Sequence, residues 1–171
     1  LPQGAIVGTS ALRRKALLLH RRPDLRIVTL RGNVDTRLAK RADGTVQATI
    51  LALAGLNRLG RTGVGTAIPE SEMLPAVGQG AVCIETRADD ARTRGWLTAI
   101  HHEATAVCVR AEHAMLVVLD GSCRTPIAGH AILTGGELHL RGLIARPDGS
   151  QVIATERRGP IAEAAALGRD A

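Results

Sequence analysis

Residues 5–14 read AIVGTSALRR, and this stretch decides the fold of the first half of the chain. The apolar run Ala5-Ile6-Val7 ends at a glycine and is typical of a short buried strand. Thr9 or Ser10 then offers a hydroxyl group that can cap a helix, which we expect to continue to His20 and to stop before a proline. The stretch therefore predicts a strand, a tight turn and a helix in immediate succession.

The same pattern recurs twice further along. Residues 26–30 (RIVTL) predict a second strand, Asn33 or Asp35 can cap the helix that follows, and residues 48–53 (ATILAL) predict a third strand. Strands that alternate with short helices form a parallel sheet covered by those helices. We therefore expect an α/β domain over residues 1–80.

Beyond residue 80 the pattern changes. Residues 81–85 (AVCIE) predict a strand, Asp89 or Asp90 can cap a helix toward residue 97, and residues 102–119 predict a long helix. Three alternating apolar segments follow, separated by turns that contain Gly135-Gly136 and Pro147-Asp148-Gly149, and they predict an antiparallel meander. We therefore expect a second unit that begins near residues 98–101, a small α+β domain with a three-stranded antiparallel sheet at 99–171.

The basic residues are concentrated in the first third of the chain. Residues 1–66 carry twelve basic and three acidic groups, a net charge of +9, whereas the whole chain of 171 residues carries +6. Twenty of the 22 basic residues are arginine, which a GC-rich genome can explain, but codon usage does not explain where they lie. A planar guanidinium can hold a carboxylate or a phosphate with two hydrogen bonds. An acidic partner of the first domain is therefore expected.

The arginines follow the predicted strands. Arg13 and Arg14 lie in the first helical turn after the first strand, Arg31 and Arg37 follow the second, and Arg58 follows the third. Basic groups at a helix N-terminus oppose the helix dipole, so a bound anion would relieve the conflict. Ligands of open α/β sheets bind outside the carboxyl ends of the strands. We expect one cleft for several carboxylates or phosphates; the alternative is that Arg13 and Arg14 are ordinary solvated surface residues.

Composition and failed motifs exclude several classes of protein. The sequence contains no Phe or Tyr, so nucleic-acid binding has no stacking platform despite a pI of about 10.5. No apolar run approaches the roughly 20 residues that cross a bilayer. Residues 63–68 lack the third glycine of a dinucleotide fingerprint, and Ala106 stands where a zinc-protease helix beginning at His102 would need histidine. We therefore expect no nucleic acid, membrane or metal partner.

The three cysteines are odd in number and widely spaced, which favours reduced thiols in the cytoplasm. Cys83 falls in a predicted strand and Cys108 on a helix stripe, so both are expected in the core. Cys123 follows Gly121-Ser122 on a loop and precedes Arg124, whose charge would favour the thiolate. Cys123 is therefore the candidate reactive thiol, and an ordinary loop cysteine is the alternative.

Together these segments resemble one family. The sequences GTSALRR, LRGNVDTRL, ALAGLNRL and LPAVGQG begin at residues 8, 30, 52 and 74, and Ala111-Glu112 and Gly121-Ser122-Cys123 follow them. In this order they are similar to hydroxymethylbilane synthase, also called porphobilinogen deaminase. The resemblance covers nearly all of the chain and implies a periplasmic-binding-protein-like α/β domain followed by the small α+β domain.

The resemblance implies a transferase. Porphobilinogen would lose ammonia to give an azafulvene, which the free α-carbon of the growing pyrrole chain attacks; four such steps precede hydrolytic release of the linear tetrapyrrole, a haem precursor. It implies that Cys123 carries one dipyrromethane cofactor per chain through a thioether bond. The residues that match cofactor-binding and substrate-binding positions are Thr9, Ser10, Arg13, Arg14, Arg31, Arg37, Arg58 and Gln79.

The resemblance also implies that the chain is a fragment. In the family an N-terminal domain supplies the catalytic aspartate, and no acidic residue here lies in that motif, so no catalytic residue is expected among the 171. Residues 81–98 would return to that missing domain, and the final helix would be cut short. We expect a cytoplasmic protein that is monomeric at full length. The alternative is an inactive fragment that serves only as an anion-binding module for polycarboxylates.

Overall fold

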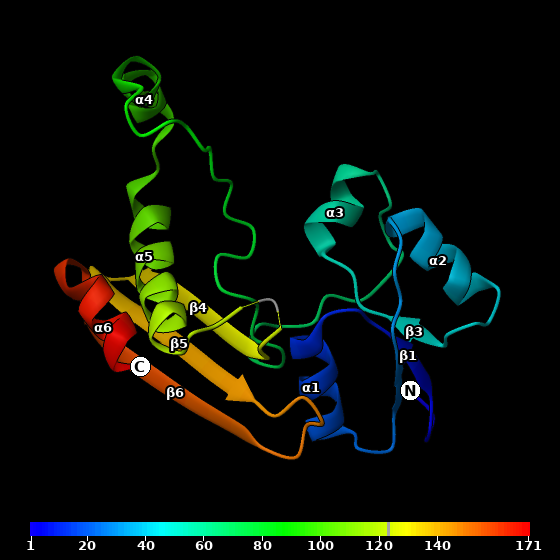
Figure 1. Cartoon of the computed structure of the whole chain (residues 1–171). Coiled ribbons are helices and arrows are strands. Elements are labelled where there is room, and N and C mark those ends of the chain that lie inside the picture. The colour runs from blue at the N-terminus through cyan, green and yellow to red at the C-terminus, as the bar shows by residue number, and fades with distance from the viewer. Residues whose placement is uncertain (123) are drawn as a thin grey trace. The chain divides into compact units, whose positions relative to one another are not determined.

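The computed structural model describes residues 1–122 and 124–171 and has a mixed α/β architecture with two three-stranded sheets (Figure 1). In chain order the elements are β1 (Ile6–Gly8), α1 (Leu12–Arg21), β2 (Arg26–Val28), α2 (Val34–Ala42), β3 (Ala48–Thr49), α3 (Leu53–Arg58), α4 (Ala91–Leu97), the 3₁₀ turn η1 (Thr98–Ile100), α5 (Glu103–Val118), β4 (Ile127–Thr134), β5 (Glu137–Ala145), β6 (Val152–Pro160), the 3₁₀ turn η2 (Ile161–Glu163) and α6 (Ala164–Asp170). Among the described residues, no helix is both long and apolar enough to span a membrane.

The described residues form two compact units. Unit 1 comprises residues 1–75, 121–128 and 143–154, and unit 2 comprises residues 76–120, 129–142 and 155–171. These units group residues by contact, whereas the predicted domains are continuous segments at 1–80, 81–98 and 99–171. Those boundaries stay a prediction.

The first sheet is parallel, as the alternation of strands and helices predicts. Its strand order is β2-β1-β3, and β1 pairs in parallel with both neighbours. Ala5, Val7 and Leu25 form the small buried cluster of this sheet. The cluster is small because the strands are only two or three residues long.

Three details of the first sheet differ from the prediction. The second strand ends at Val28 rather than at residue 30. The third strand stops at Thr49, and Leu53 already begins α3, because β3 pairs only with β1 and Gly8, the last residue of β1, pairs with Thr49. The N-cap of α1 is Ala11 rather than Thr9 or Ser10. The Thr9 hydroxyl still serves this helix end, since its Oγ1 accepts a hydrogen bond from the Ala11 backbone N at 3.2 Å.

The second sheet is the antiparallel meander that the sequence predicts, with strand order β4-β5-β6. Gly135 and Gly136 join β4 to β5 with φ angles of +59° and +85°. A two-residue hairpin turn of this kind needs positive φ at both positions, which glycine adopts without a steric penalty. The predicted caps of two helices are also confirmed, since Asn33 caps α2 and Asp90 caps α4.

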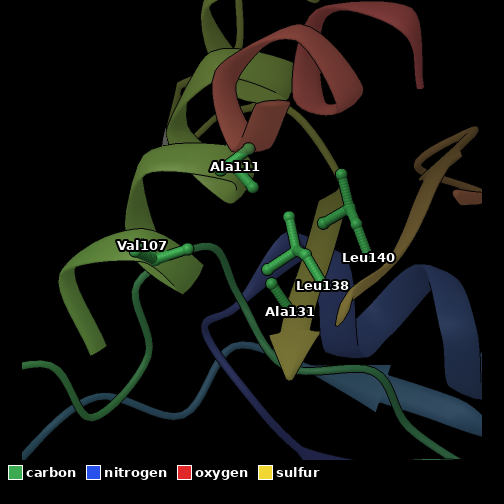
Figure 2. Packing of buried hydrophobic residues seen from close by; sticks show 6 residues of the cluster. Val107, Ala111, Ala131, Leu138 and Leu140 are labelled. Atoms are coloured by element: carbon green, nitrogen blue, oxygen red, sulfur yellow. The ribbon is translucent and has the colours of Figure 1, made fainter. Parts of the chain in front are cut away.

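The larger core of the protein lies in unit 2. Figure 2 shows Val107 and Ala111 of α5 facing Ala131, Leu138 and Leu140 of the second sheet. The two leucines are fully buried, and each buried aliphatic side chain of this size stabilises a fold by about 1.5–3 kcal/mol. Cys108 packs at the edge of this cluster, as its place on the helix stripe predicts.

The strand predicted at residues 81–85 is wrong. These residues have no regular structure, Val82 is 94% exposed, and Cys83 is exposed rather than in the core. A strand needs a neighbour to pair its backbone groups, and no described strand pairs with this segment. An apolar run alone therefore does not make a strand here.

Candidate anion-binding site

The carboxyl ends of the three parallel strands meet at one edge of the first sheet. In the sheet, Gly8 pairs with Val28 on one side and with Thr49 on the other. The Thr9 backbone N donates to the Val28 carbonyl O at 2.9 Å, and Thr49 Oγ1 donates to the Gly8 carbonyl O at 2.9 Å. The residues that follow the strands therefore lie side by side, at the end of the sheet where ligands of open α/β sheets bind.

Arg13 is buried at this edge, with 9% of its surface exposed. Its Nη1 donates to the backbone carbonyl of Leu74, which leaves the remaining guanidinium N–H groups for other acceptors. Burial, and secondarily the charge of Arg14, lowers the pKa of Arg13 to about 10. The charged form of Arg13 is therefore less favourable in the folded protein than in water.

Arg14 is partly buried and has the same kind of partner. Its Nη1 donates to the Ile50 carbonyl O at 2.9 Å, just beyond β3. Burial lowers the pKa of Arg14, and the charge of Arg37 lowers it further. In the described part of the chain, no salt bridge joins Arg13 or Arg14 to a carboxylate, and the charges that contribute to lowering their pKa values are those of Arg14 and Arg37. We call Arg13, Arg14 and Arg37 the guanidinium cluster.

The other predicted site residues of the first domain differ in burial and in hydrogen bonding. Arg37 is partly buried on α2, and its Nε donates to the Gly32 carbonyl O at 2.9 Å. Thr9 is buried, whereas Ser10, Arg31 and Arg58 are exposed. The structure thus buries Arg13 and partly buries Arg14 and Arg37, whereas Arg31 and Arg58 are exposed.

Gln79 belongs to unit 2 and lies on a tight turn, where its backbone N donates to the Ala76 carbonyl O at 3.0 Å. The carboxylate of Glu112 holds this turn: Oε2 accepts from the Gly78 backbone N at 2.7 Å and Oε1 accepts from the Ala131 backbone N at 2.7 Å. Glu112 is buried, with 5% of its surface exposed. It therefore fixes the turn that carries Gln79 to α5 and β4.

Sequence reasoning noticed Glu112 only as part of a motif and assigned it no role. The signal was a charged residue beside the apolar stripe of Val107, Ala111 and Met115 on α5, where the buried face of the helix continues. A buried carboxylate needs hydrogen-bond donors. The sequence could not show that these donors are backbone groups of two distant segments.

Cys123 lies outside the described residues. On either side of it, the Ser122 carbonyl O accepts from the Thr125 backbone N at 3.0 Å and the Ser122 Oγ accepts from the Arg124 backbone N at 3.2 Å. Residues 121–128 belong to unit 1, the unit that contains the guanidinium cluster. The role of the Cys123 thiol stays a prediction.

The parallel sheet, with arginines after its strands, and the antiparallel meander that follows it in the chain define a mixed α/β protein. Residues 1–95 match the family model "Porphobilinogen deaminase, dipyromethane cofactor binding domain", and residues 106–171 match "Porphobilinogen deaminase, C-terminal domain". The chain belongs to the porphobilinogen deaminase family, which is a family of transferases.

Curated relatives agree with this assignment. The chain is 59% identical to the porphobilinogen deaminase of Paracoccus denitrificans over 171 residues, which is 99% of this chain and 55% of that protein. It is 55% identical to the porphobilinogen deaminase of Nitrobacter hamburgensis and 54% identical to that of Nitrobacter winogradskyi, in each case over 100% of this chain and 54% of the relative. The chain spans about half the length of the curated relatives it matches.

The residues at the sheet edge fit the cofactor that the family model names. A dipyrromethane with acetate and propionate side chains is a polycarboxylate, and guanidinium forks are the side chains best suited to carboxylates. The positive charge of Arg14 acts unfavourably on Arg13, and that of Arg37 acts unfavourably on Arg14. Carboxylates bound to the guanidinium cluster would supply the opposite charge and accept hydrogen bonds from guanidinium N–H groups. Among the described residues, no group of three or more His, Cys, Asp or Glu side chains is placed to hold a metal ion.

Proposed function

We propose that the protein acts as a hydroxymethylbilane synthase: it condenses four porphobilinogen molecules, each with loss of ammonia, on a cysteine-linked dipyrromethane primer for haem biosynthesis. The observation that carries this proposal is the guanidinium cluster at the carboxyl edge of the first sheet, which has no carboxylate partner among the described residues. Family membership supports it. The alternative of an inactive anion-binding module is not favoured.

The electrostatics of the cluster support binding of a growing polycarboxylate. Hydrogen bonds to charged groups contribute about 1.5–3 kcal/mol each, roughly twice the value for neutral pairs. Burial, and secondarily the charge of a neighbouring guanidinium, lowers the pKa values of Arg13 and Arg14, and a carboxylate placed beside them would offset that repulsion. Binding would therefore relieve an unfavourable arrangement in the free protein as well as form new hydrogen bonds.

We assign the following roles to the residues of the chain. Cys123 attaches the primer, which supplies the nucleophilic pyrrole carbon when bound. The groups that hold carboxylates of primer and substrate are Thr9, Ser10, Arg13, Arg14, Arg31, Arg37, Arg58 and Gln79. We place no catalytic acid in the chain and assign charge stabilisation at the pyrrole nitrogen to a carboxylate outside residues 1–171.

The proposal also includes the domains that surround the site and the state of the working protein. The parallel sheet belongs to a periplasmic-binding-protein-like domain at 1–80, a connecting segment at 81–98 returns to another domain, and the meander belongs to a cofactor-attachment domain at 99–171. The working protein is a cytoplasmic monomer whose ligands are small polycarboxylates, without nucleic acid or membrane partners. The lack of Phe and Tyr in the sequence supports this choice of ligand.

The test is the intact mass of the protein purified from the cells that naturally produce it. We expect a covalent increment that survives denaturation and gives the colour reaction of pyrroles with Ehrlich reagent. The increment should be absent from Cys123→Ser and present in Cys83→Ser, a control at a different cysteine, which is exposed. An increment that persists in Cys123→Ser, or no increment in the natural protein, would overturn the proposal.

A further inference from the structure

The turn that joins β5 to β6 lies against α1, the helix that carries Arg13 and Arg14, and both belong to unit 1. Gly149 in this turn is buried and has a φ of +76°. A Cβ atom at Gly149 would lie 2.6 Å from the His20 backbone N, 2.7 Å from the Leu19 Cβ and 2.8 Å from the Ala16 carbonyl O. Only the backbone of a glycine fits at this contact, because any side chain would push the turn and the helix apart.

A polar contact accompanies the close approach. The Nδ1 atom of His20 lies 3.0 Å from the Gly149 carbonyl O. A carbonyl oxygen only accepts hydrogen bonds, so this contact requires that Nδ1 carry the hydrogen. His20 therefore donates to the turn from the last turn of α1.

The turn is shaped by its own hydrogen bonds. Asp148 Oδ1 accepts from the Ser150 backbone N at 3.0 Å and from Ser150 Oγ at 2.7 Å, and the Gly149 backbone N donates to the Arg146 carbonyl O at 2.9 Å. These bonds to Ser150 also hold the pKa of the Asp148 carboxyl below its ordinary value. These hydrogen bonds within the turn define the conformation in which it contacts the helix.

The other end of the same segment reaches the loop that contains Cys123. The backbone N of Ala145, the last residue of β5, donates to the Pro126 carbonyl O at 3.0 Å. Residues 121–128, residues 143–154 and α1 all belong to unit 1. A continuous series of contacts therefore runs from the loop, through Ala145 and the turn, to the helix with the arginine pair.

We infer that Gly149 is a positioning residue, which fixes the distance between Pro126 and the guanidinium pair of Arg13 and Arg14. This inference rests on the proposed function. Ala16 touches the turn only three residues from Arg13, about 4.5 Å along a helix. A methyl group at Gly149 must move the helix or the turn by about 1 Å, and displacements of this size can reduce catalytic efficiency by up to about 100-fold.

The decisive comparison is Gly149→Ala against Gly136→Ala in the natural protein. Both positions have positive φ, so both alanines cost similar backbone strain, but a Cβ at Gly136 meets no atom within 4 Å. We expect Gly149→Ala to raise KM for porphobilinogen at least tenfold and to lower the fraction of protein that carries dipyrromethane. Gly136→Ala should leave KM and the loaded fraction within twofold of the unmutated protein.

The salt dependence of KM distinguishes a displaced guanidinium pair from a general loss of stability, because a general loss of stability would not change it. If Gly149→Ala displaces the guanidinium pair, log KM should rise less steeply with log salt concentration than in the unmutated protein, because fewer charges face the substrate carboxylates. His20→Phe keeps a ring but loses the donor, and it should shift KM in the same direction by about threefold. It serves as the second variant if Gly149→Ala does not fold.

The outcomes separate the two proposals. Natural protein without a dipyrromethane increment would overturn the proposed function and this inference with it. Natural protein with the increment, combined with a KM and a salt slope in Gly149→Ala and His20→Phe equal to those of Gly136→Ala, would overturn the inference alone.

Discussion

Arg13 in unit 1 and Glu112 in unit 2 are both buried charges, and their surroundings differ. Each carboxylate oxygen of Glu112 accepts a hydrogen bond from a backbone N at 2.7 Å. Arg13 donates to one backbone carbonyl, and burial, with the charge of Arg14 as the second cause, lowers its pKa. The hydrogen bonds of Glu112 stabilise the fold, whereas the lowered pKa of Arg13 favours the proposal that this residue binds an anionic ligand.

The two regions also differ in their apolar support. Unit 2 surrounds Glu112 with a core that includes Val107, Ala111, Leu138 and Leu140, whereas the buried cluster beneath the parallel sheet holds only three residues. We therefore expect changes in unit 2 to act mainly on stability. Changes at the edge of the parallel sheet should act mainly on binding.

The largest effect is expected in the core of unit 2. Leu140→Ala should lower the free energy of unfolding by about 3 kcal/mol, because it removes a fully buried side chain and leaves a cavity. Ile132→Ala on β4, at a side chain that is 39% exposed, is the matched control and should cost less than about 1 kcal/mol. Urea unfolding measures both, and equal losses would contradict the description of this core.

A smaller effect is expected at Glu112. In Glu112→Gln the amide oxygen can replace one carboxylate oxygen, but the NH₂ group faces a second N–H donor, so one buried backbone N loses its acceptor. The cost should be about 2 kcal/mol in urea unfolding.

The control for Glu112→Gln is His113→Gln, at the exposed neighbouring position of α5, which should change stability by no more than about 0.5 kcal/mol. If both substitutions have the same small effect, Glu112 does not hold the turn of Gln79, and the contrast with Arg13 fails.

The smallest effect concerns an ion pair in unit 1 and depends on pH. Arg22 Nε and Nη2 each donate to Asp24 at 2.7 Å, and these bonds, with a bond from the Gly4 backbone N, hold the pKa of Asp24 well below its ordinary value of 3.8. Because the pKa is lowered on folding, the stabilisation is complete above pH 4 and is lost as the pH falls through the lower value.

Asp24→Asn should therefore be slightly less stable than the unmutated protein at pH 7 and should approach it as the pH falls below 4. The effect is small because the pair is partly open to solvent. Urea midpoints at pH 7, 4 and 3 measure it, and a difference that does not change with pH would refute this role of Asp24.

The elements that local patterns define were predictable from the sequence. The meander follows from alternating apolar residues and glycine turns, and the caps at Asn33 and Asp90 follow from side chains that bond to the next turn of their own helix. The arginines at the strand ends were also predictable, because a parallel sheet brings its carboxyl ends to one edge.

The features that depend on distant partners were not predictable. The length of β3 is set by Gly8 of β1, and residues 81–85 lack a paired strand although their sequence favours one. The role of Glu112 depends on backbone groups 34 and 19 residues away. Nothing in a local window reports such partners.

The central claim is that the guanidinium cluster binds pyrrole carboxylates, and the most direct test is calorimetric titration of the protein with porphobilinogen. Arg14→Gln should weaken binding at least tenfold, or about 1.4 kcal/mol. Arg110→Gln, at an exposed arginine on α5 that lies 3.8 Å from Glu103, should leave the affinity within twofold. Equal affinities for Arg14→Gln, Arg110→Gln and the unmutated protein would contradict the claim.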